Sequence, residues 1–320
     1  MSRLVEIREQ LQDTQAALAQ LDRALAGEPL ESAARSLLVT AVSLKKRRRE
    51  LEQEFVGEAN KRGIDVCTYR LFAEHSQPTV AAVAGTIGQF QKLISIVYAT
   101  IKHGPLERLR LREDVILETA FEFGYSFAGS VGLVFTLPNE RLLGDIESRL
   151  DETFDAVIKM TEADSPEALR AFAHKYGVAP LRALYAWTNE HVTGGIGAGI
   201  DWQRNQQVRL TRLAQLGELE NLREMLASTG DEGREVKKYS GILLGADAQP
   251  KRFHFKPDQG NEIRGTYENA INPAQHPELF KRYIAEIERI EVIHYATEQE
   301  DVNYFLQSLT DTGIRPYDHG

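Results

Sequence analysis

The sequence predicts an α+β protein made of three parts. These are an N-terminal antiparallel helical hairpin of coiled-coil type over residues 1–62, a helix-covered antiparallel sheet over 64–229, and a small β-barrel over 236–312, before a tail at 313–320. The first prediction rests on heptad spacing of apolar residues. The second rests on helical periods mixed with short alternating runs, and the third on a change to period two after Gly233.

Residues 3–26 are predicted to form the first helix, because apolar residues recur there at alternating spacings of three and four. Residues 27–29, Gly-Glu-Pro, end it, and a second heptad helix follows over about 31–60. Such a short break implies an antiparallel pair. Two helices alone have little core, so we expect the seam of the first helix to be buried against a second copy, another protein or the central sheet. The seam residues are Leu4, Ile7, Leu11, Leu18, Leu21 and Leu25.

The second helix carries a basic run of Lys45, Lys46, Arg47, Arg48 and Arg49. Runs of this kind are typical of nuclear-import or nucleic-acid patches. Acidic residues follow directly, and residues 1–62 are nearly neutral, so a solvated helix face is the alternative.

The central sheet is predicted around a hairpin at residues 117–137, where apolar and polar residues alternate. A three-residue loop at 128–130 would pair Phe123 with Phe135 and place both apolar rows on one face. We therefore expect Phe123 in the core. The opposite face is expected either to be exposed or to be approached closely by another element, because glycines line it at 124 and 132.

Helices are expected to cover one face of this sheet, and a second hairpin around residues 200–210 is expected to extend it. Apolar periods and caps such as Ser165-Pro166 place the helices at about 78–103, 140–163, 165–176, 181–192 and 212–228.

The C-terminal part follows a linker predicted at residues 229–233 from its composition. Five strands are predicted, at about 236–246, 251–256, 262–268, 283–296 and 302–310. Short strands in this number suggest an SH3-like or OB-like barrel.

One barrel strand has a basic face formed by Arg252, His254 and Lys256. Small barrels bind nucleic acid through basic strand faces that also carry aromatic residues. Here Phe253 and Phe255 alternate with the basic residues and should point into the core. The alternatives to nucleic-acid binding are therefore a surface for a protein, a surface for an anionic ligand, or a plain solvated face.

The sequence assigns no catalytic residue, cofactor or metal site. Cys67 is the one cysteine, so an intramolecular disulfide and a multi-cysteine zinc site are excluded, and we expect it to be a small core residue. The eight histidines form no metal-ligand spacing. Glu118 and Glu122 are expected on one strand face, where they would keep an exposed or edge face soluble. They are also the acid–base candidates if the protein is an enzyme.

The net charge of −9 argues against a chain devoted to nucleic acid or anionic membrane. A charged N-terminus, the single thiol and the lack of a long apolar run predict a cytosolic protein without a membrane partner.

We expect a non-enzymatic interaction protein that oligomerises or docks a partner through its helical hairpin. The layout resembles that of accessory proteins in bacteria, and by this analogy alone the chain would be an adaptor or sensor, for example in phage defence. The alternatives are a nucleic-acid-binding accessory protein, using basic patches at 45–49 and 251–256, and an enzyme with an unrecognised site.

Overall fold

The computed structural model describes residues 3–27, 30–73, 77–108, 110–127, 131–138, 148–204, 207–268 and 277–312. The chain has a mixed α+β fold, as predicted. It divides into two compact units, Met1–Ser228 and Thr229–Gly320.

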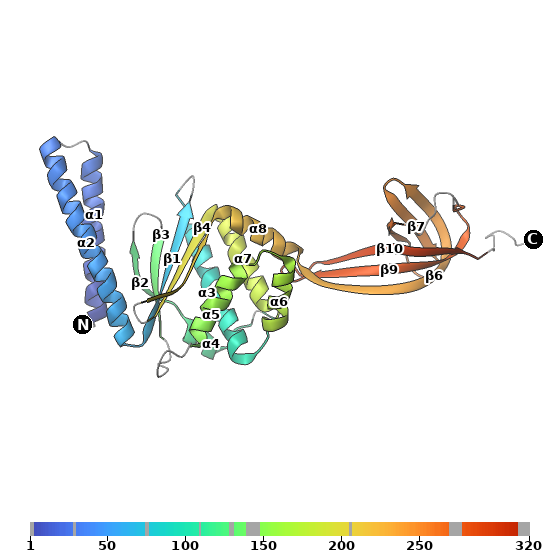
Figure 1. Ribbon diagram of the computed structural model, residues 1–320, viewed down its shortest axis with the longest axis horizontal. Coiled ribbons are helices and arrows are strands. Elements are labelled where there is room, and N and C mark those ends of the chain that lie inside the picture. Colours follow the sequence, from blue (N-terminus) through green and yellow to red (C-terminus); the bar gives the residue numbers. More distant parts are fainter. Residues whose placement is uncertain are drawn as a thin grey trace, which may run out of the picture. The chain divides into compact units, whose positions relative to one another are not determined.

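The first unit has three layers, with a five-stranded antiparallel sheet between two groups of helices (Figure 1). The sheet has the order β2-β3-β1-β4-β5, so the second predicted hairpin does extend it. The strands are β1 (Ile64–Ala73), β2 (Glu122–Phe127), β3 (Val131–Pro138), β4 (Ile196–Arg204) and β5 (Gln207–Ala214).

One layer of helices holds α3 (Val80–His103), α4 (Glu113–Thr119), α5 (Arg149–Thr161), α6 (Pro166–Tyr176), α7 (Ala179–Gly194) and α8 (Leu216–Ser228). Local signals set several of their ends: the Thr79 hydroxyl accepts from the Ala82 N–H at 3.2 Å, and Gly104 ends α3 at a φ of 92°. By length and composition α3 could also span a membrane. Here its second half is buried in the unit, where Phe90 stacks on Tyr69 of β1 at 4.5 Å.

The other layer is formed by α1 (Arg3–Ala26) and α2 (Glu31–Lys61), which run antiparallel. Arg3 pairs with Glu54, and Arg47 donates to Gln10 Oε1 at 3.1 Å. The two helices pack on the sheet through a buried cluster of Ile7, Leu11, Leu51, Phe55, Ala59, Val66, Tyr125 and Val134. Helices therefore lie on both faces of the sheet, and the prediction of one covered face was wrong.

The predicted central hairpin is only partly correct. Residues 113–119 form α4, so β2 begins at Glu122 rather than near Leu117. Phe123 pairs with Phe135 as predicted, but a β-bulge follows and Tyr125 then pairs with Val134. The predicted loop at 128–130 lies outside the described residues.

The bulge changes the face to which each aromatic ring points, because one extra residue reverses the alternation. Tyr125 and Phe127 turn towards α2, whereas Phe123 is left 51% exposed instead of buried. Gly124 is the residue at the bulge, and a Cβ there would lie 2.9 Å from the Val134 carbonyl oxygen and 3.2 Å from the ring of Phe55. The expected close approach of another element to this glycine is confirmed.

Replacing Phe123 with alanine should lower the free energy of unfolding by about 1 kcal/mol, because only about half of the side chain leaves water on folding. Phe154→Ala is the matched control: this fully buried ring should cost about 3–5 kcal/mol. Urea denaturation followed by tryptophan fluorescence measures both. Equal losses for the two variants would contradict the bulged register.

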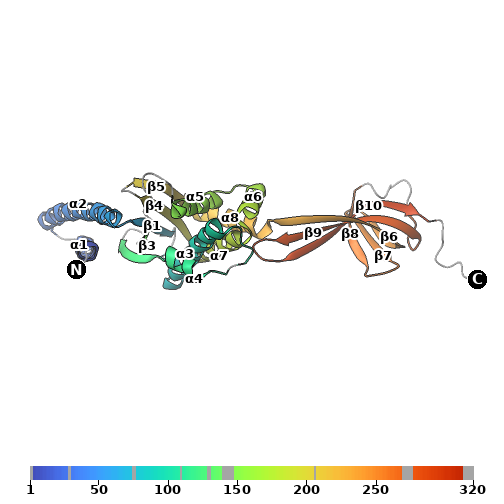
Figure 2. The ribbon, with the colours of Figure 1, turned by 90° about the horizontal axis from the view of Figure 1, so that it is seen from below.

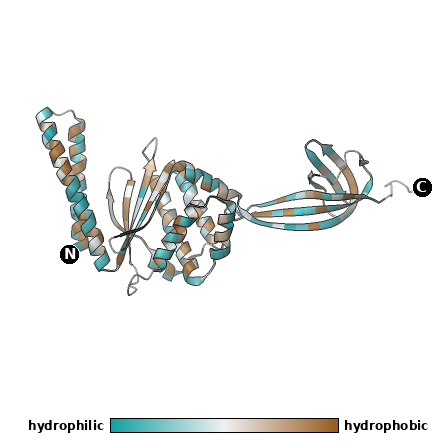
Figure 3. Cartoon of the chain, in the orientation of Figure 1, coloured by the Kyte–Doolittle hydropathy of each residue, from teal (hydrophilic) through white to brown (hydrophobic). Residues whose placement is uncertain are grey.

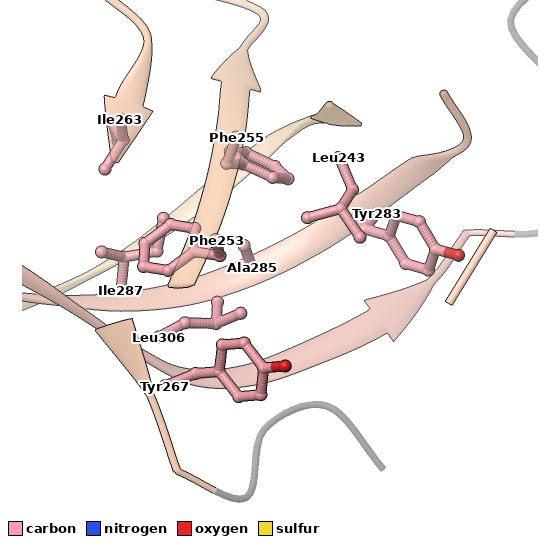
Figure 4. Packing of buried hydrophobic residues seen from close by; sticks show 9 residues of the cluster. All are labelled: Leu243, Phe253, Phe255, Ile263, Tyr267, Tyr283, Ala285, Ile287 and Leu306. Carbon is pink, nitrogen blue, oxygen red and sulfur yellow. The ribbon is translucent and has the colours of Figure 1, made fainter. Parts of the chain in front are cut away.

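The second unit contains β6 (Gly230–Ala248), β7 (Lys251–Pro257), β8 (Ile263–Tyr267), β9 (Arg282–His294) and β10 (Glu300–Asp311). They close a five-stranded barrel in the order β10-β8-β7-β6-β9, so the predicted small barrel is confirmed. Figure 4 shows its core of Leu243, Phe253, Phe255, Ile263, Tyr267, Tyr283, Ala285, Ile287 and Leu306.

Strands β6 and β10 are clearly longer than the sequence predicted, whereas β9 has about its predicted length. Residues 230–233, expected to be a linker, belong to β6, which pairs with β9 from Gly230 to Ile242. The pairing of β6 with β7 starts only at Gly241. The first half of β6 therefore continues with β9 and β10 as a ribbon beyond the barrel (Figure 2).

Candidate functional site

A cavity of about 600 Å³ lies between α2 and the sheet face that is turned towards it. Figure 3 shows hydrophobic and hydrophilic residues along both α1 and α2 and along the strands of the sheet. The side chains that give the cavity its character are three arginines, one carboxylate and two aromatic rings: Arg48, Arg49, Arg70, Glu52, Tyr125 and Phe127.

Secondary structure explains how these side chains meet. Arg48 and Glu52 are four residues apart on α2 and so lie on one helix face. Arg70 shares a face of β1 with Val66 and Thr68, because side chains alternate along a strand. Tyr125 and Phe127 share a face of β2, and the bulge at Gly124 turns that face towards α2.

The charges in the cavity are only partly compensated. Arg48 Nε lies 3.3 Å from Glu52 Oε1, and Arg70 Nη2 lies 3.1 Å from Asp201 Oδ2. The side chain of Arg49 makes none of the hydrogen bonds or ion pairs found among the described residues. Burial raises the pKa of Glu52, and the neighbouring Arg48 and Arg49 oppose this rise. Arg48 Nε is itself buried, and although Glu52 Oε1 lies 3.3 Å away, the two atoms do not form a hydrogen bond.

An aromatic ring forms part of the cavity wall. The guanidinium of Arg70 lies 5.8 Å from the centre of the Phe127 ring, within the range of a cation–π contact. The ring rests on Gly132, where a Cβ would come within 2.2 Å of it, so only glycine leaves room for this position. The cavity can thus offer cationic, hydrogen-bonding and stacking groups to one ligand.

A buried polar network lies on the opposite face of the sheet. The Tyr69 hydroxyl lies 2.6 Å from His191 Nε2 and accepts from Trp187 Nε1 at 2.8 Å, while His191 Nδ1 lies 2.9 Å from the Ile196 carbonyl oxygen. Burial lowers the pKa of His191 to about 4 and raises that of Tyr69. These groups are enclosed and satisfy one another, so we assign them a structural role.

The predicted basic run divides between two surroundings. Arg47 reaches towards α1 and Glu50, whereas Arg48 and Arg49 line the cavity. Lys45 and Lys46 are exposed. Four of the five side chains are exposed and Arg48 is half-buried, so most of the run is solvated, and part of it also lines the cavity.

The predicted seam is largely covered by the chain itself. Ile7, Leu11 and Leu18 are buried, while Leu4, Leu21 and Leu25 are half-buried. A different apolar strip is exposed on α2, formed by Leu38, Val39 and Val42 at 53%, 72% and 68% exposure. Sequence reasoning missed this strip, although the spacing of Leu38 and Val42 by four residues indicates a common helix face.

In the barrel, Phe253 and Phe255 point into the core and Arg252 and Lys256 outward, as predicted. His254 Nε2 lies 2.9 Å from Glu262 Oε2, so this face is partly neutralised. Nucleic-acid binding by Arg252, His254 and Lys256 stays a prediction.

The proposed acid–base pair was wrongly placed. Glu118 lies on α4, while Glu122 begins β2, so they do not share a strand face. The hydrogen bond from Lys102, 2.8 Å away, is the main cause that lowers the pKa of Glu118, although partial burial opposes it. Cys67 is buried, and burial raises the pKa of its thiol, as expected for a small core residue.

The described residues contain no group of three or more His, Cys, Asp or Glu side chains placed to hold a metal ion. No protein-family model, curated protein or solved structure matches the chain. The geometry described above is therefore the basis for a functional conclusion.

Proposed function

We propose that this chain is a non-enzymatic cytosolic interaction protein that self-associates through its N-terminal helical pair and serves as an adaptor or accessory subunit. The observation that carries the proposal is the exposed apolar strip of Leu38, Val39 and Val42 on α2. Leu38 and Val42 lie one helical turn apart, and Val39 lies beside them. Adjacent exposed apolar residues of this kind typically mark an interaction surface.

A second copy of the chain is the partner that fits this strip best. Residues 1–62 contain eleven Lys/Arg and ten Asp/Glu, so the helical pair is almost neutral and would not repel another copy. A two-fold arrangement would place the same strip of both copies in contact. The packing would then be of coiled-coil type, with helices from both chains around one seam.

The barrel would supply a second surface in such an adaptor. Its closed five-stranded form is compatible with an SH3-like or OB-like module, and its outward Arg252 and Lys256 favour an anionic partner.

The double substitution Leu38→Glu and Val42→Glu is expected to turn a dimer into a monomer, because it would bury charges at the contact. Static light scattering on the full chain at micromolar concentration measures the mass. Ser36→Glu with Ser43→Glu is the matched control, since it adds the same charge at exposed positions of α2 outside the strip. A monomeric wild-type chain, or a dimer that survives the first pair of substitutions, would refute the proposal.

A further inference from the structure

We propose that the cavity between α2 and the sheet binds a small phosphorylated ligand with a planar ring, which is the chemistry of a nucleotide. Arg48, Arg49 and Arg70 would hold the phosphate, and Phe127 would stack on the ring. This inference does not depend on self-association, because every lining residue comes from one chain.

The charge of the lining favours an anion. The lining holds three guanidinium groups and the carboxylate of Glu52, and Arg70 is also paired with Asp201. Three positive and two negative charges leave a net charge of about +1, which favours an anion such as a phosphate monoester. Arginine suits this ligand particularly well, since its planar fork of N–H donors fits phosphate oxygens in pairs.

Two of the arginines also have unused hydrogen-bonding capacity. The side chain of Arg49 makes no hydrogen bond or ion pair with any described residue. Arg48 Nε is buried 3.3 Å from Glu52 Oε1 without a hydrogen bond to it, so Glu52 compensates the charge of Arg48 without satisfying this donor. Arg70 is held in place by Asp201 at 3.1 Å and by the ring of Phe127, so its guanidinium is already oriented.

The size and the walls of the cavity indicate a ligand larger than inorganic phosphate. Sites for small molecules typically measure about 300–1,000 Å³, and this cavity, at about 600 Å³, lies within that range. Phe127 is half-buried and offers a ring to a base, while Thr68, Gln53 and Gln203 offer polar groups to its edge. Stacking on an aromatic side chain is tolerant of the base, so the structure assigns the ligand class and not one base.

The first test is calorimetric titration of the full chain with AMP, GMP, CMP and UMP, with adenosine and inorganic phosphate as partial ligands. At least one nucleotide should bind, and adenosine and phosphate should each bind about tenfold or more weakly, since each lacks half of the contacts. Failure of all four nucleotides to bind at millimolar concentration would overturn the proposal. Equal affinity for inorganic phosphate would overturn the assignment of the ring.

The second test determines whether the nucleotide binds in this cavity. Arg49→Gln should weaken nucleotide binding about tenfold or more, the effect of losing a charged hydrogen bond. Arg47→Gln is the matched control, because Arg47 is two residues away on α2 but reaches Gln10 and Glu50 instead of the cavity. Phe127→Leu should weaken nucleotide binding by a larger factor than phosphate binding, because it removes the stacking ring from the nucleotide, whereas Asp201 still holds Arg70.

Equal effects of Arg49→Gln and Arg47→Gln would show that the nucleotide binds elsewhere. Arg49 is exposed and makes no bonds to other described residues, so its substitution should leave the fold intact. An unchanged thermal midpoint of tryptophan fluorescence will check this for each variant.

Discussion

Replacing Asp151 with alanine is expected to lower the free energy of unfolding of the first unit by about 3–5 kcal/mol, the range for breaking a buried ion pair. Asp151 pairs with Arg204, and the side chains of both are close to 90% buried, at 12% and 11% exposure. It also accepts from Trp202 Nε1 at 2.8 Å and from the Ser148 N–H at 2.8 Å. The substitution removes all these contacts from a site with little access to water.

The lowered pKa of Asp151 also indicates that its carboxylate stabilises the first unit. Burial alone would raise the pKa of this carboxyl, yet the hydrogen bonds from Trp202 and Ser148 and the charge of Arg204 lower it overall. The carboxylate is thus better stabilised inside the fold than in water. It also belongs to the capping box that begins α5, so its loss affects the helix end as well.

Urea denaturation measured by tryptophan fluorescence isolates this effect, because both tryptophans, Trp187 and Trp202, lie in the first unit. Asp155→Ala is the matched control on the same helix. Asp155 pairs with Lys159 at 2.7 Å on the surface, and exposed pairs contribute at most about 1 kcal/mol. If the two alanine variants lost the same stability, the buried pair would not hold β4 to α5.

Lowering the pH from 7 to 4 is expected to cost the first unit about 3 kcal/mol of stability through His191. The pKa of this imidazole is about 4 in the folded chain, below its ordinary value of 6.5, because burial disfavours the charged form. Between these two values the unfolded chain binds more protons than the folded chain. Stability is therefore fully present above pH 6.5 and is lost as the pH falls towards 4.

The measurement is the free energy of unfolding at several pH values for the wild type and for His191→Gln, which keeps a donor and an acceptor but does not titrate. The stability of the wild type minus that of His191→Gln should fall by about 3 kcal/mol from pH 7 to pH 4. The carboxylates titrate equally in both proteins, so their effect cancels in this difference. His174→Gln, at an exposed position on α6, should follow the wild type at every pH. Parallel curves for wild type and His191→Gln would show that the network around Tyr69 does not keep the imidazole neutral.

Elements defined by local patterns could be predicted from the sequence. The five barrel strands follow from alternation between turn residues, and α3 and α6 follow from apolar periods that end at Gly104 and Gly177. The inward rings of Phe253 and Phe255 required only the period of a strand. In each case the signal lies within a few consecutive residues.

The central hairpin shows a structure that local sequence patterns did not predict correctly. Residues 117–127 alternate like one strand, yet their first part is helical, because a short alternating run does not distinguish a helix end from a strand. A bulge adds one residue without changing the composition around it, and Gly124 is its only trace in the sequence. That one residue decides that Tyr125 faces the cavity and that Phe123 faces solvent.

The candidate site itself was decided by the tertiary structure. In the sequence, Arg48 interrupts a heptad seam, Arg49 ends a basic run and Arg70 is an ordinary polar position of a strand. They meet because the buried cluster around Phe55 and Tyr125 sets α2 against β1 and β2. Periodicity shows which face of an element is apolar, but which two faces meet depends on packing between residues far apart in the chain, and no local pattern records it.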